Sequence, residues 1–256
     1  PLYLTYRHYP VDDPKVTGAY GEWKDYNAYS DFISSEGVPV FYARVDHVSV
    51  PLAKEGTGQV VVDFTPEPLT QDVSFVFHIE KTADVVVDSL TAEISGIPST
   101  MELTTGLILA QKTYKLLFRP TYAALPSAAD SASAEALRCE ASVNIPGIVR
   151  SHTEDMVTGP GILQIAIYTH YDYEEEGTQR KAAKVFHAGI NLYHTLKERK
   201  SLQWDEEENG YRQASRSITV EIGSPLNIDK DGILNGGSTS TGLDQWIPGE
   251  TFEIEV

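Results

Sequence analysis

The sequence predicts an all-β protein with two tandem β-sandwich domains, and three observations support this prediction. Between Asp72 and Glu80 apolar side chains alternate with polar ones, the period-2 pattern of a half-buried strand. A second alternating run covers residues 85–95 and fits no helical spacing. Short runs of this kind recur along the chain between Gly and Pro turn signals, which is typical of sandwiches rather than of βαβ units.

The composition allows a large core and argues against several classes of partner. The chain has 256 residues, enough for one large or two ordinary domains, and 41% of them are hydrophobic. The formal net charge of −17 argues against nucleic acid and anionic lipid, because both require a basic patch on the protein. No apolar run approaches the roughly 20 residues of a membrane-spanning helix.

The first 37 residues differ from the rest, because turn-forming residues dominate there and little β-pattern is present. Aromatic side chains are scattered among them, including Trp23, Tyr26 and Tyr29. Two interpretations stay open. These side chains form a binding surface for a sugar or a partner chain, or they anchor an irregular loop to the domain.

The β-pattern begins at Val38 and defines the first predicted domain, residues 1–122, with 1–37 as its loop-rich start. Residues 38–52 suggest one strand. Residues 56–64 suggest another, with Val60, Val62 and Phe64 facing inward. Pro66 and Pro68 end this strand, and the domain continues with the central pair at 71–95 and with runs at 96–109 and 112–120.

A stretch of small residues predicts the domain boundary, and we place a solvated Ala/Ser-rich linker at 123–136. The second predicted domain, residues 137–256, begins with an alternating run that has Cys139 on its apolar face. We therefore expect a buried, unreactive thiol. The run at 162–171 is apolar on both faces, as in a central strand. Further strands are expected at residues 184–192, 215–223 and 250–256.

No arrangement of residues indicates catalysis or a bound metal. A single cysteine excludes an internal disulfide and any multi-cysteine metal site. Residues 227–238 resemble the start of a Ca²⁺ loop, but Ser238 stands where a bidentate Glu is required, so a turn-rich loop is the better interpretation. The seven histidines lack zinc-site spacing, and phosphate-loop and nucleophile-elbow motifs are absent from the sequence. We predict no enzymatic activity, no catalytic residues, no cofactor and no metal.

Several segments together resemble the fimbrillin-like surface lipoproteins of Bacteroidetes. They are residues 38–52, 60–80 and 90–108, with a closing Trp-containing turn and alternating strand at 242–256. The resemblance covers residues 38–120 and 137–256. It implies two transthyretin-like, Greek-key sandwiches and a structural role as subunit, tip or anchor of a fimbrium.

The resemblance also implies a location and partners. The protein is expected at the cell surface, held at the outer membrane by a lipid anchor outside this sequence. The chain begins at Pro1 without an initiator Met or apolar leader, which is typical of a mature or trimmed product. Expected partners are other fimbrial subunits, bound by strand exchange, or host and bacterial surface ligands in cell adhesion.

The closing strand is the predicted donor for such exchange, with Phe252, Ile254 and Val256 as the side chains that enter a neighbour's core. The competing interpretation, that this strand completes its own domain, stays open. So does a second function, that of a surface glycan-binding lipoprotein with aromatic sugar platforms. Its candidate residues are Trp23, Tyr26, Tyr29, Trp204 and Tyr211.

Overall fold

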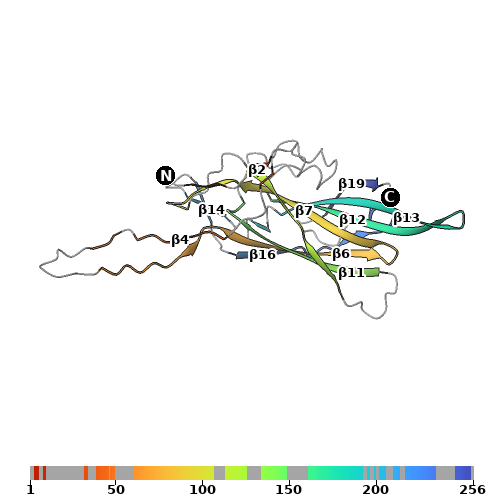
Figure 1. Cartoon of the computed structure of the whole chain (residues 1–256), viewed down its shortest axis with the longest axis horizontal. Helices are drawn as coiled ribbons and strands as arrows, with labels where there is room; N and C mark the ends of the chain where they lie inside the picture. The colour runs from red at the N-terminus through yellow and green to blue at the C-terminus, as the bar shows by residue number, and fades with distance from the viewer. Residues whose placement is uncertain are drawn as a thin grey trace.

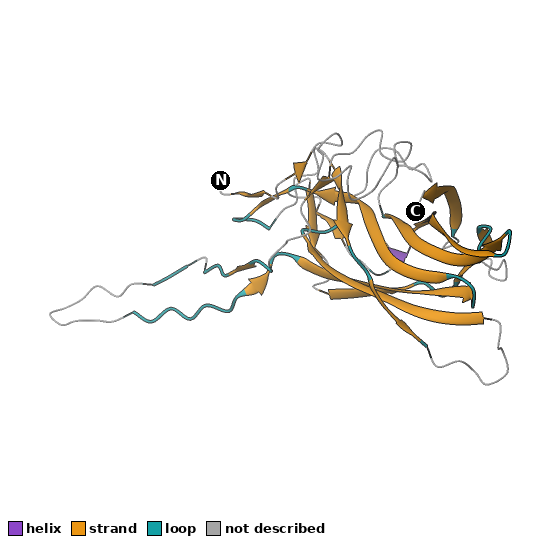
Figure 2. Ribbon diagram, turned by 45° about the vertical axis from the view of Figure 1, so that its right-hand side comes forward, coloured by secondary structure: helices purple, strands orange, loops and turns teal. Residues whose placement is uncertain are grey.

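The computed structural model confirms the all-β class. It describes residues 3–5, 8–9, 32–33, 39–45, 47–49, 60–106, 113–125, 134–148, 161–192, 195–196, 199, 202–205, 210–213, 217–234 and 246–254. These residues form strands and the turns and loops between them, apart from one helical turn at residues 195–196 (Figure 2).

Two large sheets form the body of the molecule (Figure 1). The six-stranded sheet has the order β10 (Thr121–Ala124), β11 (Ala134–Ile145), β6 (Gln71–Thr82), β17 (Leu226–Ile228), β18 (Ile233–Leu234), and β16 (Ser217–Glu221) also pairs with β6. The seven-stranded sheet has the order β19 (Ile247–Ile254), β13 (Thr178–Asn191), β12 (Ile162–Glu175), β7 (Val86–Pro98), β9 (Thr113–Phe118), β3 (Phe32–Ile33), β2 (His8–Tyr9).

Three smaller pairs lie outside these two sheets. They are β1 (Tyr3–Thr5) with β8 (Thr100–Glu102), β4 (Phe41–Tyr42) with β5 (Glu67–Pro68), and β14 (Leu202–Asp205) with β15 (Gly210–Gln213).

The core lies between the inner faces of the two large sheets. On β6 the predicted alternation is confirmed. Asp72 and Glu80 are exposed, and no surface is exposed on the inward apolar side chains, which are Val73, Phe75, Phe77 and Ile79. Phe75 stacks on Phe118 of β9, with ring centroids 5.5 Å apart, which joins the two sheets directly. Side chains of both inner faces therefore pack into one layer.

The central strands of the seven-stranded sheet are buried on both faces. On β7 the core side carries Leu90, Ala92 and Ile94, and Glu93 on the opposite side is buried as well. Residues 162–167 of β12 are all buried, and β12 lies between β13 and β7, as expected from its run of apolar residues.

The predicted division into two domains is not what the described residues show. β11 pairs antiparallel with β6 along its whole length, and β12 pairs with β7. One large hydrophobic cluster of the described residues extends from Ile33 to Trp246. The residues assigned to a linker at 123–136 include the end of β10 and the start of β11, which are neighbours in one sheet. The boundary at 123–136 is therefore corrected, because it separates neither two sheets nor two cores.

This shared core predicts how the two halves behave when separated. Fragments 1–125 and 134–256 should each lack cooperative unfolding. The first keeps β6 and β7 without their partners β11 and β12, and the second keeps β11 and β12 without β6 and β7. Mixing the two fragments should restore a cooperative unfolding transition. The measurement is near-UV circular dichroism during urea titration. The uncut chain is the control and should unfold in one step. A cooperative transition in either isolated fragment would contradict the single core.

Candidate functional site

The most prominent surface feature is an arm, which we define as residues 39–45, 47–49 and 60–68. It extends away from the body along the long axis of the molecule (Figure 1). At its base β4 and β5 pair through Phe41 with Pro68 and Tyr42 with Glu67. Beyond this pair, the described residues of the arm belong to neither large sheet.

The base of the arm is fixed to the body by backbone and side-chain contacts. The Leu69 amide donates to the Val40 carbonyl at 2.7 Å, and the Val40 amide donates to Thr70 Oγ1 at 3.2 Å. Leu69 and Met101 form a small separate core against which Val40, Tyr42 and Leu103 pack. The arm then continues directly into β6, so its direction depends on the central strand of the body.

A tight turn supports this small core. Thr104 and Thr105 donate hydrogen bonds of 2.9 and 2.8 Å to the Glu102 carboxylate, and these bonds lower the pKa of Glu102. Gly106 follows with a positive φ of 71°, and a Cβ there would lie 3.2 Å from Leu69 Cδ2. Glycine is therefore required by both the backbone conformation and the space beside Leu69.

Large apolar side chains are exposed along the arm. Val61 is 73% exposed and Phe64 is 59% exposed. The prediction that Val60, Val62 and Phe64 face a core is thus wrong for Val60 and Phe64, and Val62 is only half-buried. The alternation correctly indicated extended chain, but no second layer covers it in the described structure. The exposed set is Phe41, Val45, Val48, Val60, Val61 and Phe64.

The closing strand is paired within its own chain. β19 runs antiparallel to β13, with Phe252 opposite Val185 and Ile254 opposite Ala183. Phe252 is half-buried and makes an edge contact with the His187 ring, with centroids 5.4 Å apart. The core side of β13 carries Phe186, so Phe252 lies on the outer face rather than in the core. Val256 lies outside the described residues.

The aromatic candidates are only partly located. Trp204 and Tyr211 occupy directly opposite positions of the β14–β15 hairpin, although they lie seven positions apart in the sequence (211 − 204). Trp23, Tyr26 and Tyr29 lie outside the described residues. The structure thus brings two of the five candidates together.

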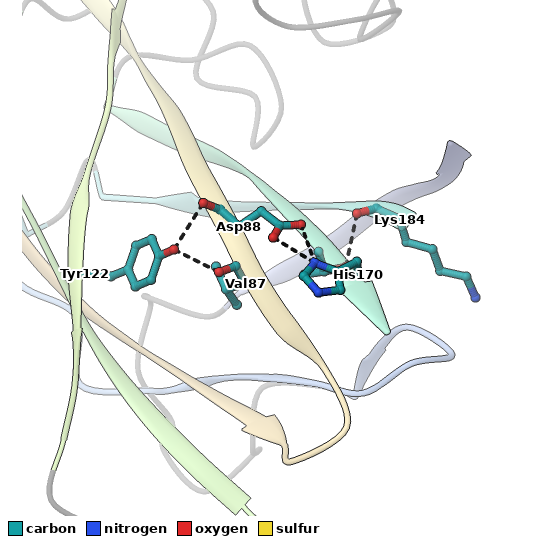
Figure 3. A network of polar contacts seen from close by, with 6 residues as sticks. Val87, Asp88, Tyr122, His170 and Lys184 are labelled. Atoms are coloured by element: carbon teal, nitrogen blue, oxygen red, sulfur yellow. Dashed lines mark hydrogen bonds and ion pairs between the residues drawn. The ribbon is translucent and has the colours of Figure 1, made fainter. Parts of the chain in front are cut away.

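A polar network connects the two sheets beside a β-bulge (Figure 3). The register of β7 against β12 shifts at Asp88, which is the extra residue. Its carboxylate oxygens lie 2.8 and 2.9 Å from His170 Nδ1 on β12. The Tyr122 hydroxyl, from β10 in the other sheet, lies 2.8 Å from the Val87 carbonyl oxygen and 3.1 Å from that of Asp88. Tyr122 therefore holds the edge of one sheet onto the other.

The loop that resembled a Ca²⁺ site closes the β17–β18 hairpin. Asp229 Oδ1 accepts hydrogen bonds from the amides of Asp231 and Gly232, at 2.7 and 2.8 Å. This local pattern is an Asx turn. Within the described ranges, no three His, Cys, Asp or Glu side chains gather in a way that could hold a metal ion. No helix in the described part of the chain is long and apolar enough to cross a membrane.

A buried ion pair that the sequence pattern did not predict lies on the outer face of the seven-stranded sheet. Lys115 Nζ on β9 lies 2.5 Å from Glu93 Oε1 on β7 and 3.4 Å from Gln164 Oε1 on β12. Burial raises the pKa of Glu93, and the nearby Lys115 partly opposes that effect. The sequence signal that could have indicated this pair is a single charged residue within each apolar strand run, Glu93 in one and Lys115 in the other.

The comparisons with known proteins add no assignment to this geometry. No family model, no curated protein and no solved structure matches the chain. Function is therefore inferred from the arm, the sheet edges and the polar clusters themselves.

Cys139 on β11 has no exposed surface, and burial raises the pKa of its thiol from 9.0 to about 12. The folded state therefore keeps the proton while the unfolded chain loses it above pH 9. This contribution to stability is complete below pH 9. It is lost as the pH rises from 9 towards 12, by about 1.4 kcal/mol per pH unit.

The measurement is the free energy of unfolding by urea at several pH values, for the native sequence and for Cys139→Ala. Their difference isolates the thiol from the lysines and tyrosines that titrate in the same range. Parallel pH profiles for the two proteins would contradict a buried, protonated Cys139.

Proposed function

We propose that this chain is a non-enzymatic structural subunit of a cell-surface fimbrium, which binds its neighbour by β-strand pairing. The single observation that carries the proposal is the arm, with its exposed apolar side chains and its extended backbone outside both large sheets. In this proposal, the two large sheets of the body have the transthyretin-like Greek-key arrangement. A lipid anchor outside this sequence holds the protein at the outer membrane.

The chemistry of the arm suits strand addition. An extended segment offers rows of backbone donors and acceptors to the open edge of another sheet, and its alternate side chains enter pockets there. Val60, Val62 and Phe64 have the required period of two. Contiguous apolar side chains on a monomer surface also mark interaction sites, because their exposure to water is unfavourable.

The position of the arm favours assembly with a second copy of this chain. The arm and β19 lie towards opposite ends of the long axis (Figure 1), and β19 is the last strand of its sheet in the described residues. A contact between the arm of one copy and β19 of the next is heterologous, because it joins two different surfaces. Such contacts build open filaments when they do not close into rings.

In this proposal the donated segment is the arm, in place of the closing strand. Phe252 and Ile254 belong to a strand that already pairs with β13, so β19 offers its free edge as acceptor, and the arm is the donor. In a tip subunit the same arm would bind a host or bacterial surface ligand instead of a further subunit.

The experiment compares association before and after the apolar side chains of the arm are replaced. Val61→Asn with Phe64→Asn should abolish concentration-dependent self-association in analytical ultracentrifugation. It should change the free energy of unfolding by less than about 0.5 kcal/mol, since both side chains are exposed. The matched control is Val86→Asn, which alters an exposed valine on the body. A native chain that stays monomeric at every concentration, or an arm variant that still associates, would contradict the proposal.

One observation favours a second candidate function, the binding of surface glycans. Trp204 and Tyr211 are opposed across a two-stranded hairpin, where aromatic neighbours can form a stacking platform. Trp204→Ala should then lower the affinity for a bound glycan at least tenfold on a glycan array, while Tyr173→Ala, at the exposed end of β12, should not. Equal binding by both variants and the native chain would exclude a platform at this hairpin.

A further inference from the structure

Three functional groups of different chemistry meet on adjacent strands of the seven-stranded sheet. Glu93 on β7 is opposite Gln164 on β12, and Lys115 reaches both from β9. Glu93 is 1%, Gln164 2% and Lys115 6% exposed. An amine, a carboxyl group and a carboxamide are thus held together almost completely out of water.

The cluster lies on the face of the sheet opposite the main core. The neighbours of Glu93 and Lys115 in sequence, Ile94 and Leu116, belong to the core cluster, so the polar side chains point to the other side. Both faces of the sheet are therefore shielded here. Shielding favours condensation over hydrolysis, because water competes poorly as a nucleophile in a buried site.

Burial favours the uncharged form of the Glu93 carboxyl group. Glu93 Oε2 is buried and has no hydrogen-bond partner among the described residues, which is unfavourable for an ionised carboxylate. Burial raises the pKa of Glu93, which makes its carboxylate a suitable acceptor for a proton of the adjacent Lys115 ammonium. A neutral, desolvated lysine amine is a nucleophile.

We propose that Lys115 and Gln164 form an intramolecular isopeptide bond, with Glu93 as the catalytic residue that moves the protons. The geometry that points to this is the contact of Lys115 Nζ with both Glu93 Oε1 and Gln164 Oε1. The bond would be a covalent modification of the folded chain, formed once per molecule, and it needs no oxidant or cofactor.

The reaction balances with the groups present. Glu93 takes a proton from the Lys115 ammonium, and the neutral Nζ attacks Cδ of Gln164 to give a tetrahedral intermediate. The Nζ–Cδ bond remains, the bond from Cδ to the side-chain nitrogen breaks, and that nitrogen leaves as ammonia. Glu93 returns one proton to the leaving nitrogen and accepts the one lost from Nζ. The net change is amine plus carboxamide to secondary amide plus ammonia.

The product would link β9 to β12 across β7. Like a disulfide, a cross-link between residues 115 and 164 restricts the unfolded chain and stabilises the fold. It would also prevent β9 from separating from β12 under tension. The inference stands independently of the proposed assembly, since it concerns the interior of one chain.

The primary test is the intact mass of the purified, folded native chain, followed by a peptide map. The expected result is a mass lower than that of the sequence by one ammonia, together with a branched peptide joining Lys115 to Gln164. The map is needed because the Asn-Gly steps at Asn209 and Asn235 can also lose ammonia by cyclising. A full sequence mass, or an ammonia loss mapped only to an Asn-Gly step, overturns the proposal.

Two variants separate the role of Gln164 as the acyl group from the role of Glu93 in proton transfer. Gln164→Leu keeps the Lys115–Glu93 ion pair, so it should fold and should have its full sequence mass and a lower melting temperature. Glu93→Ala should leave the bond unformed in chains that fold by circular dichroism. Lys184→Arg, at another buried lysine, is the matched control and should still lose ammonia. Loss of one water in place of ammonia would assign the bond to Lys115 and Glu93, and would overturn the role given to Gln164.

Discussion

The packing of β6 against the seven-stranded sheet is the interaction on which the other features depend. β6 pairs with β11 along one edge and with β16 and β17 along the other, so it is central in its own sheet. Its inward side chains, such as Phe75 and Phe77, are fully buried and contact Phe118 and Trp246. Because β6 contacts segments from both halves of the sequence, the described residues form one body with one main core.

The arm follows from the way β6 begins. The chain enters β6 through Leu69 and Thr70, whose contacts with Val40 hold both sides of the arm at the edge of the body. Beyond the β4–β5 pair, no strand of the described structure packs over the arm, so its apolar side chains are exposed to solvent. A stable base with an uncovered extension is suited to binding outside the molecule, because its direction is set before any partner arrives.

The outer face of the seven-stranded sheet is unusual in burying charge. A buried acid and a buried amine are unfavourable unless they pair closely, and one Glu93 oxygen still has no partner in the part of the chain that the structure describes. Replacement of such a pair by apolar side chains commonly leaves a protein as stable or more so. Stability alone is therefore a weak reason for placing Glu93, Lys115 and Gln164 together, and a chemical role accounts for the same geometry.

Alternation in the sequence by itself determined the β class, the buried face of β6 and the burial of Cys139, since a period of two marks a strand with two different faces. The continuous apolar run of β12 determined its central position, since such a run marks a strand buried on both faces. Only the tertiary structure decided what covers each face. It paired β11 with β6, left Val60 and Phe64 uncovered, turned Phe252 outward and brought Lys115 to Gln164. These outcomes depend on contacts between residues far apart in the chain, and local alternation is the same whether a face meets a sheet, a neighbour or water.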